Sequence, residues 1–361
     1  MSTEIFTITH KPFTPPDDPM YIPLHVGRAK SGDLGFLGDD TGESISAENP
    51  YFCELTGMYW IWKNRCNADY IGICHYRRYL INDKGCLFTQ AELEDVLSQY
   101  DIVTTKLLTL TCSYEQGFSE NHHRKDLQIT ADVIQEKYPE YYHTYRSLVT
   151  GPHTYFGNIF VTSKELYSRY CQWLFDILFE VKKRTDFTGY NSYQKRLFGF
   201  LSEFLQTLWI QKNGLTAYEC MVGMSGEKYE TRQLKEKLGT FFAARDYEGA
   251  KLYFLDCYKK RPDVLMEASD ITGELRLCMQ IISTCSFEDE AKGTCILDFI
   301  KDYHSLISHF HSLNQAVSHE LAGKASPEEK LFLSDKNLAS PQAVNIAKML
   351  FAHKNQETSV K

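Results

Sequence analysis

The sequence predicts an α/β protein: a mostly parallel, Rossmann-type sheet flanked by helices, followed by an α-helical C-terminal tail. Up to about residue 230, apolar β-branched segments alternate with segments of helical periodicity. Beyond that point the strand signals stop and only helical stretches follow. The length of 361 residues suits two domains. We therefore expect an α/β domain over 1–230 and a helical domain over 231–361.

The composition supports a folded, acidic protein. Hydrophobic residues make up 43% of the chain and aromatic residues 14%, which is enough for a sizeable core and unlike a disordered chain. The formal net charge is −8 and the pI is about 5.9. An acidic chain is a poor general binder of nucleic acid, so we expect no nucleic-acid partner and interpret any cationic cluster as a local, specific feature.

Cysteine usage and the absence of targeting signals predict a cytoplasmic location. The eleven cysteines are scattered without a CxxC pair, so reduced thiols are expected. The first residues lack the basic start and the apolar stretch of a signal peptide. No apolar run approaches the roughly 18 residues of a membrane span. Any work at the inner face of a membrane would then be peripheral.

The N-terminal third predicts a strand, two irregular segments and a helix. Residues 4–10 are apolar and β-branched, which indicates a first strand. Residues 11–23 are rich in proline and predict an irregular loop. Residues 27–46 are rich in Gly, Asp and Ser and predict a long polar loop, of the kind that often carries function. Ser46 then resembles the N-cap of an aromatic helix over 50–64.

The middle of the chain continues the alternation. We predict a strand at 69–75, a helix at 89–100 and a strand at 101–106. A polar, histidine-bearing loop is expected over 112–126, before a helix at about 127–149. Adjacent histidines rarely chelate one ion, so we interpret this loop as a polar segment near substrate. Strands followed by helices in this order predict a parallel sheet.

The remaining segments predict a strand, two amphipathic helices and a helical tail. The strand is expected at 155–164 and the two helices at 165–184 and 191–213. Residues 238–262 resemble one tetratricopeptide unit, with a small and aromatic residue pattern typical of a packed helix pair. A single such unit is too few to predict a solenoid fold. Further helices are predicted over 264–285, 294–322 and 341–353.

The segment GICHYRRY, residues 72–79, places cations at the end of a buried strand. In open α/β sheets, ligands bind at the carboxyl ends of the strands. Arg77 and Arg78 keep their charge and offer forked donors that suit phosphate or carboxylate, and His75 adds a donor or a titratable group. The alternative is a surface ion-pair cluster above Tyr76 and Tyr79.

Carboxylates in two other segments are candidates for binding or catalysis. Asp39 and Asp40 could bind a metal or sugar hydroxyl groups, although aspartate-rich loops are more often solvated turns. Glu54 lies in an apolar helix and must be at an edge or paired. Glu203 lies in the apolar run LFGFLSEFLQTLW, where burial could raise its pKa and suit it to act as a base. The alternative is an exposed glutamate on the helix surface.

Two further features narrow the chemistry. Asn158 follows a glycine at the predicted strand 155–164, where a backbone or a sugar could approach closely. The sequence contains no GxGxxG, no P-loop and no GxSxG, which argues against common dinucleotide, NTP and serine-hydrolase sites.

Several stretches together resemble one family. In chain order they are THKPF, YIPLHVG, DDTGESIS, NPYFCELTGMYWIWKN, YIGICHYRRYL, YFGNIFV, YCQWLFDILFEV and YQKRLFGFLSEFLQTLW. They resemble the domain-of-unknown-function 4422 family of bacterial capsular and exopolysaccharide glycosyltransferases, over about residues 4–220. The resemblance implies a GT-A-like fold and sugar transfer, of galactofuranose or galactose, from a UDP-sugar donor to a glycan or lipid-linked glycan acceptor.

The resemblance also implies roles for the candidate residues. The tip of the strand at 69–75 stands where metal-dependent GT-A enzymes carry an Asp-x-Asp motif, so cations there would replace a metal. We therefore expect no metal cofactor; a divalent ion held by Asp39 or Asp40 is the alternative. Glu203 would deprotonate the acceptor for inverting transfer. The expected donor-binding residues are Thr9, His10, Lys11, Asp40, Asn49, Glu54, His75, Tyr76, Arg77, Arg78 and Asn158.

The chain departs from the family pattern at two places. Glu43 and Ser44 stand where the pattern has Asp-Asn, and Phe204 replaces an arginine after Glu203. The second change removes a cation near the expected base.

A different class of function also remains: a non-catalytic module that binds nucleotide-sugars, with a helical tail that recruits protein partners of a polysaccharide synthesis complex.

Overall fold

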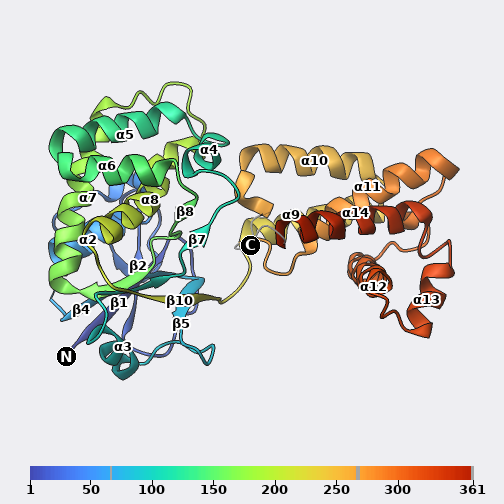
Figure 1. Cartoon of the computed structure of the whole chain (residues 1–361), viewed down its shortest axis with the longest axis horizontal. Helices are drawn as coiled ribbons and strands as arrows, with labels where there is room; N and C mark the ends of the chain where they lie inside the picture. Colours follow the sequence, from blue (N-terminus) through green and yellow to red (C-terminus); the bar gives the residue numbers. More distant parts are fainter. Residues whose placement is uncertain (66, 266–268, 359–361) are drawn as a thin grey trace. The chain divides into compact units, whose positions relative to one another are not determined.

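The structure is a computed structural model that describes residues 1–65, 67–265 and 269–358, with side chains described as far as residue 351. The chain divides into two compact units, Met1–Ser225 and Gly226–Lys361. The first unit contains a sheet covered by helices, and the second contains helices alone over the described residues (Figure 1). Cys66 lies outside the described residues; the cysteines that are described are free thiols.

The first unit is built on one large sheet. Its strand order is β3-β2-β1-β4-β5-β10-β6-β9, and β9 also pairs with β4, so that the last five strands close a ring. A second sheet pairs β7 with β8. The strands are β1 (Thr3–Thr9), β2 (Tyr21–His25), β3 (Leu37–Gly38), β4 (Tyr70–His75), β5 (Arg78–Ile81), β6 (Ile102–Thr105), β7 (Leu108–Thr109), β8 (His153–Thr154), β9 (Phe160–Ser163) and β10 (Ala217–Met224).

The predicted mostly parallel sheet is wrong in part, because the sheet is mixed. Parallel pairs join β1 to β2 and β4, β2 to β3, and β6 to β10. In contrast, β9 runs antiparallel to β4 and β6, and β5 runs antiparallel to β4 and β10. The chain reverses from β4 into β5 within two residues, a connection that permits only antiparallel pairing. The alternation of strands and helices did not reveal this hairpin.

Helices cover both faces of the sheet. Figure 1 shows α2 and α5 to α8 on one side and α3 on the other, and each face has its own apolar cluster. The helical segments of this unit are η1 (Arg28–Lys30), η2 (Ser46–Glu48), α1 (Asn49–Phe52), α2 (Leu55–Asn64), α3 (Gln90–Leu97), α4 (Tyr114–Ser119), α5 (Arg124–Lys137), α6 (Pro139–Val149), α7 (Lys164–Arg184), η3 (Gln194–Arg196) and α8 (Leu197–Lys212).

Two segments predicted to be irregular contain strands. β2 lies inside the proline-rich segment, and its Pro23 is paired with Thr7 of β1. β3 pairs with β2 only from Leu24 onward, so β2 is an edge strand at Pro23, where a missing N–H is tolerated. β3 itself lies within the predicted polar loop. The predicted loop over 112–126 is also partly wrong, because it contains α4 and the start of α5.

The predicted helix over 50–64 is interrupted, and Ser46 is not its N-cap. Cys53 has a φ of +52° and separates α1 from α2. Ser46 instead begins η2, where its hydroxyl donates a hydrogen bond to the carboxylate of Asp39 and accepts the amide N–H of Ala29. Ser46 therefore joins two loops instead of capping a helix.

The second unit is helical over the described residues. Leu238, Phe242, Ala250 and Phe254, which carry the tetratricopeptide-like pattern, are buried in the packed pair α9–α10. The helix predicted over 264–285 starts only at Glu274, and its residues 266–268 lie outside the description. The segments are α9 (Tyr229–Ala243), α10 (Tyr247–Lys260), η4 (Pro262–Leu265), α11 (Glu274–Lys292), η5 (Ile296–Asp298), α12 (Tyr303–Leu321), α13 (Pro327–Ser334) and α14 (Pro341–Thr358).

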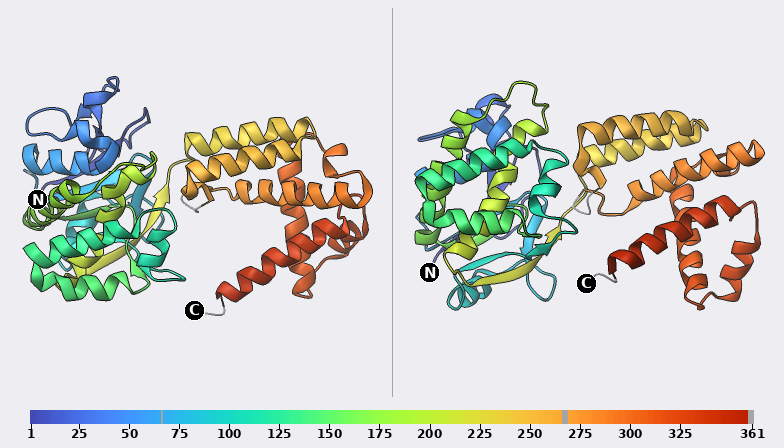
Figure 2. Two further views of the ribbon diagram at one scale, coloured as in Figure 1. Left: turned by 90° about the horizontal axis from the view of Figure 1, so that it is seen from above. Right: turned by 45° about the horizontal axis from the view of Figure 1, so that its top comes forward.

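Figure 2 shows the same segments of each unit from two further directions. Among the described residues, no helix has both the length and the apolar character needed to cross a bilayer.

The core of the second unit generates a stability prediction. Phe242 is fully buried there, whereas Leu252 is 69% exposed. Phe242→Ala should lower the free energy of unfolding by about 3–5 kcal/mol, because it leaves a cavity. The matched Leu252→Ala should change it by less than about 0.5 kcal/mol. Urea denaturation monitored by circular dichroism measures both, and equal losses would contradict this assignment of the core.

Candidate active site

The candidate site begins at the hairpin between β4 and β5. Ile8 of β1 lies opposite His75, the last residue of β4, and the amide of Tyr76 donates to the carbonyl of Ile8 at 3.0 Å. The chain turns over Tyr76 and Arg77 and returns with Arg78, which pairs with His75. The amide of Ser225 donates to the carbonyl of Arg77 at 3.0 Å. The predicted cationic tip is therefore held rigidly at the carboxyl ends of β1 and β4.

His75 is held in its neutral form. Burial lowers the pKa of its imidazole to about 4, and the positive charges of Arg78 and Arg77 act in the same direction. The negative charge of Glu54 and a contact with the backbone of Gly157 oppose the shift. Its Nε2 atom is buried and has no hydrogen-bond partner among the described residues. This nitrogen is therefore available to a ligand.

Asn158 joins the segments that form the site. Its Nδ2 atom donates to Glu54 Oε1 at 2.6 Å, to Ser202 Oγ at 2.9 Å and to the carbonyl of Gly199 at 3.3 Å. Asn158 is 1% exposed and has a φ of +47°, and the preceding Gly157 has a φ of +99°. Its Oδ1 atom has no partner among the described residues. One side chain thus links the α1–α2 junction, α8 and the loop before β9.

Glu54 is presented by the break between α1 and α2. Asn49 stabilises this break, since its Nδ2 atom donates to the carbonyl of Cys53 at 2.7 Å and to Thr56 Oγ1 at 3.3 Å. A Cβ atom on Gly199 of α8 would lie 3.3 Å from the side chain of Cys53 and 3.7 Å from Glu54 Oε2. The glycine therefore permits α8 to approach the carboxylate closely. In this arrangement the side chain of Asn49 positions Glu54.

Glu203 faces Glu54 from the adjacent helix α8. Its Oε1 atom accepts the backbone N–H of Gly157 at 2.9 Å. Burial, followed by the negative charge of Glu54, raises the pKa of Glu203 to about 8, while the Gly157 N–H and the charges of Arg78 and Arg196 act against this rise. Glu203 is half-buried in the candidate site and is not a solvated surface glutamate.

A second group of predicted residues forms an aromatic cluster beside the hairpin. The His10 ring lies edge-on to Tyr76, with ring centroids 5.7 Å apart, and Phe13 lies 5.8 Å from the same ring. Thr9 is buried, and its hydroxyl donates to the carbonyl of Lys11 at 2.6 Å and accepts the N–H of Lys11 at 3.1 Å. This arrangement fixes the end of β1 and places aromatic rings beside the hairpin.

The aspartate-rich loop has a largely structural role. Asp39 is fully buried and accepts the amides of Gly27 at 3.0 Å and Arg28 at 3.3 Å, in addition to the hydroxyl of Ser46. Asp40 Oδ1 lies 3.8 Å from Arg28 Nε. No cluster of three or more His, Cys, Asp or Glu side chains able to hold a metal ion is found among the described residues. The predicted independence from metal stays a prediction.

Several site residues were not anticipated from the sequence. Ser202 and Gly199 of α8 accept hydrogen bonds from Asn158, and the spacing of three residues between them is a usable signal for one helix face. Arg196 places a positive charge near Glu203, which offsets the arginine that Phe204 replaces in the family pattern. Arg196 precedes Glu203 by seven residues, about two helical turns, and η3 runs directly into α8, so this proximity is a local signal that the sequence reasoning missed.

The histidine-bearing segment lies next to Arg196, and its His122 is part of an aromatic cluster. His122 packs against the rings of Phe118, Phe200 and Tyr193, at centroid distances of 4.8, 4.4 and 5.3 Å. Burial, together with the charge of Arg196, lowers its pKa to about 4. His122 is therefore a neutral member of an aromatic wall.

Comparison with known proteins identifies the family. The family model described as "Domain of unknown function (DUF4422)" matches residues 4–214. The chain belongs to the DUF4422 family. The match spans β1 to the end of α8 and includes every residue expected above to bind donor or to act as base.

The DUF4422 protein is also similar to a solved structure of the WbbM bifunctional glycosyltransferase in its apo form. The two are 30% identical with a TM-score of 0.58, over 63% of this chain and 46% of that one. The chain thus accounts for about half the length of the WbbM chain. A search of curated proteins found no match. The mixed α/β fold is therefore similar to part of a glycosyltransferase structure.

The raised pKa of Glu203 generates a prediction on stability. Its folded-state pKa of about 8 lies above its ordinary value of 4.5, so the native state holds the proton more tightly than the unfolded chain. That contribution is complete below pH 4.5 and is lost as the pH rises through 8. The Tm of the wild type should therefore fall more between pH 5 and about 9 than the Tm of Glu203→Gln, which cannot titrate.

Differential scanning calorimetry across this pH range measures the effect. The matched control is Glu165→Gln, an exposed glutamate on α7, which should follow the wild type. A Tm that depends on pH equally in Glu203→Gln and in the wild type would contradict the proton-retaining state of the half-buried Glu203.

Proposed function

We propose that the protein is a glycosyltransferase that moves a sugar, galactofuranose or galactose, from a UDP-sugar donor to a glycan or lipid-linked glycan of a bacterial surface polysaccharide, with inversion. The observation that carries this proposal is the position of Glu203, which is bound to the Gly157 amide, faces Glu54 and lies in the field of Arg78. The DUF4422 match and the fold of a glycosyltransferase structure support the reaction class.

The hairpin cations suit the diphosphate of the donor. The forked guanidinium groups of Arg77 and Arg78 match phosphate oxygens and keep their charge at all relevant pH values. Neutral His75 offers a ring nitrogen that has no hydrogen-bond partner among the residues that the structure describes. Together they would stabilise the negative charge that develops on UDP as it leaves. The cluster of His10, Phe13 and Tyr76 at the end of β1 would hold the base.

Glu203 suits the acceptor side. In its ionised form the carboxylate removes the proton of the acceptor hydroxyl while the new bond from that oxygen to the anomeric carbon forms. The bond from the anomeric carbon to the phosphate oxygen breaks in the same displacement, and UDP leaves with its electron pair. Attack from the opposite side inverts the anomeric centre. A pKa of about 8 places this base close to working pH, where general bases are most effective.

The first activity test removes the base. Glu203→Gln should lower kcat by at least about a hundredfold, in line with the contribution of a general base, while UDP binding measured by calorimetry stays unchanged. Glu165→Gln is the matched control and should keep wild-type activity. Transfer by Glu203→Gln at the wild-type rate would remove this residue from the mechanism.

A second test addresses the hairpin. Arg77→Ala combined with Arg78→Ala should weaken UDP binding and reduce kcat, because the charge on the leaving diphosphate loses both guanidinium partners. Arg146→Ala, an exposed arginine on α6, serves as the charge-matched control. The reaction should proceed in excess EDTA. Full activity of the double variant, or complete loss of wild-type activity in EDTA, would overturn the role of the cations.

The second candidate function is a non-catalytic binding module of a polysaccharide synthesis complex. It is favoured by the exposed apolar side chains Leu252, Leu255 and Tyr258 on α10, which suit recruitment of a protein partner. That function predicts UDP binding by the wild type without turnover of any UDP-sugar.

In either case we propose that the protein works in the cytoplasm, with peripheral attachment to the inner face of the membrane where a lipid-linked acceptor resides.

A further inference from the structure

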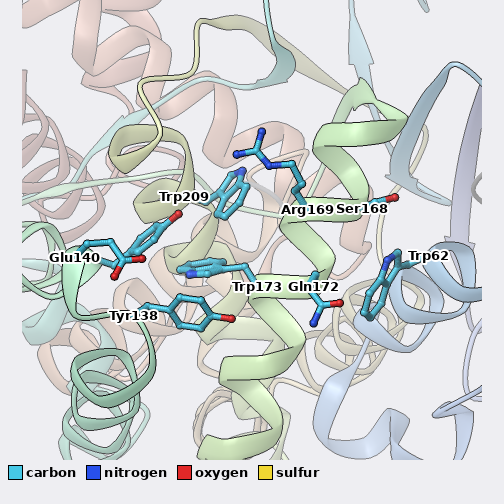
Figure 3. Close-up of a pocket in the computed structure, with 9 residues that line it drawn as sticks. Trp62, Tyr138, Glu140, Ser168, Arg169, Gln172, Trp173 and Trp209 are labelled. Atoms are coloured by element: carbon cyan, nitrogen blue, oxygen red, sulfur yellow. The ribbon is translucent and has the colours of Figure 1, made fainter.

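An aromatic groove opens on the first unit away from the candidate active site. It has a volume of about 470 Å³ and lies among α2, α6, α7 and α8 (Figure 3). Three indoles and two phenols form its apolar lining: Trp62, Tyr138, Tyr141, Trp173 and Trp209. A concave site lined by aromatic rings with a few polar groups is typical of ligand binding.

The rings of the groove are fixed in place before any ligand arrives. The ring centroids of Trp173 and Trp209 lie 5.2 Å apart, and Tyr141 stacks on Trp209 with an interplanar angle of 11°. The hydroxyl of Tyr138 donates to Asp176 at 2.9 Å, and that of Tyr141 is 3.0 Å from Asn213 Nδ2. A preformed wall of this kind avoids much of the entropic cost of ordering side chains on binding.

Polar side chains without protein partners surround the rings. Glu140, Arg169 and Gln172 line the groove, and within the described part of the chain they form no hydrogen bond or ion pair. Trp173 is 4% exposed, yet its indole N–H is buried and has no acceptor there. Buried indole N–H groups usually have a partner. The groove therefore offers apolar faces together with unused hydrogen-bonding groups.

The groove is separate from the Glu203 site. Glu203 and Trp209 are both on α8, but six residues separate them, which corresponds to about 9 Å along the helix axis. Glu203 is bonded to Gly157, whereas Trp209 packs with Tyr141 and Trp173. No residue assigned above to the donor or the base lines the groove.

We propose that this groove is a second, non-catalytic binding site for carbohydrate, which holds a short oligosaccharide. Sugars present an apolar C–H face that packs on an aromatic ring, and a rim of hydroxyl groups that pairs with amide, guanidinium, carboxylate and indole groups. Both requirements are met here, the first by the partly exposed rings of Trp62 and Tyr138, and the second by Glu140, Arg169 and Gln172. If the proposed function holds, the occupant is a distal part of the glycan acceptor; binding itself does not depend on transfer.

A membrane surface fits the groove less well. The indoles of Trp173 and Trp209 are 4% and 6% exposed, so they are recessed and do not project as interfacial anchors do. Hydrocarbon also supplies no acceptor for the Trp173 N–H.

Intrinsic fluorescence provides a direct test, because three of the four tryptophans of the chain line the groove. The probes are maltohexaose, cellohexaose and galactohexaose, each titrated into the full-length protein. We expect a saturable change in emission with at least one of them. Gln172→Ala and Arg169→Ala should each weaken that binding about tenfold, which corresponds to about 1.4 kcal/mol, and Trp62→Ala should abolish it.

Matched controls separate the groove from general effects. Gln135→Ala on α5 and Arg146→Ala on α6 remove the same chemical groups from exposed positions outside the groove and should bind normally. If Trp62→Ala does not fold, the Gln172 and Arg169 variants decide the result. Glu203→Gln should also bind normally, so a failure of the transferase proposal would leave this result untouched.

Three outcomes would overturn the proposal. They are the absence of a fluorescence response to all three hexasaccharides, a response that survives in the Gln172 and Arg169 variants, and groove-dependent flotation with phosphatidylglycerol–phosphatidylethanolamine vesicles without any response to sugar. The last result would assign the groove to a membrane surface.

Discussion

The buried amide of Asn158 is the interaction on which the candidate site depends. The loop before β9, which carries Asn158, is joined by this one side chain to the α1–α2 junction through Glu54 and to α8 through Ser202 and Gly199. The N–H of the preceding Gly157, whose own φ is also positive, donates a hydrogen bond to Glu203. Because a buried amide is costly to leave without partners, the three hydrogen bonds hold these elements together. The geometry of the two carboxylates follows from this arrangement.

The electrostatics of the site follow from the same packing. Glu54 and Glu203 lie close enough for one negative charge to disfavour the other, and burial adds to the effect, so the proton stays on Glu203 near neutral pH. The cations at the hairpin and at Arg196 prevent a still larger shift. His75 responds in the opposite direction and stays neutral. The pKa of Glu203 is raised and that of His75 is lowered. Neighbouring groups with pKa values shifted in opposite directions are typical of acid–base catalysis, which is why we assign the base to Glu203.

The sequence predicted part of this site for reasons that can be stated. An apolar run that ends in HYRR indicates a strand whose last residues carry positive charge. The apolar neighbours of Glu203 in LFGFLSEFLQTLW indicate that its carboxylate is at least partly buried. Both signals lie within a few residues of the site they predict. The contacts of Asn158 with Glu54 could not be predicted, because 104 residues separate them and only the tertiary fold brings them together. The positive φ of Cys53 likewise has no signal in a non-glycine residue. Strand direction was predicted least well, since the β4–β5 hairpin and β9 carry no pattern that fixes their orientation.

The central claim is that Glu203 must lose a proton for transfer. The most direct test is the pH dependence of kcat/KM between pH 5 and about 9.5, with UDP-galactose or UDP-galactofuranose as donor. The account predicts a tenfold rise in kcat/KM per pH unit on the acidic side, ending in a plateau above about 8. It also predicts that Glu54→Gln moves the rise in kcat/KM to lower pH, because removing the negative charge of Glu54 lowers the pKa of Glu203. A profile that is flat across this range, or that Glu54→Gln leaves in place, would contradict the account.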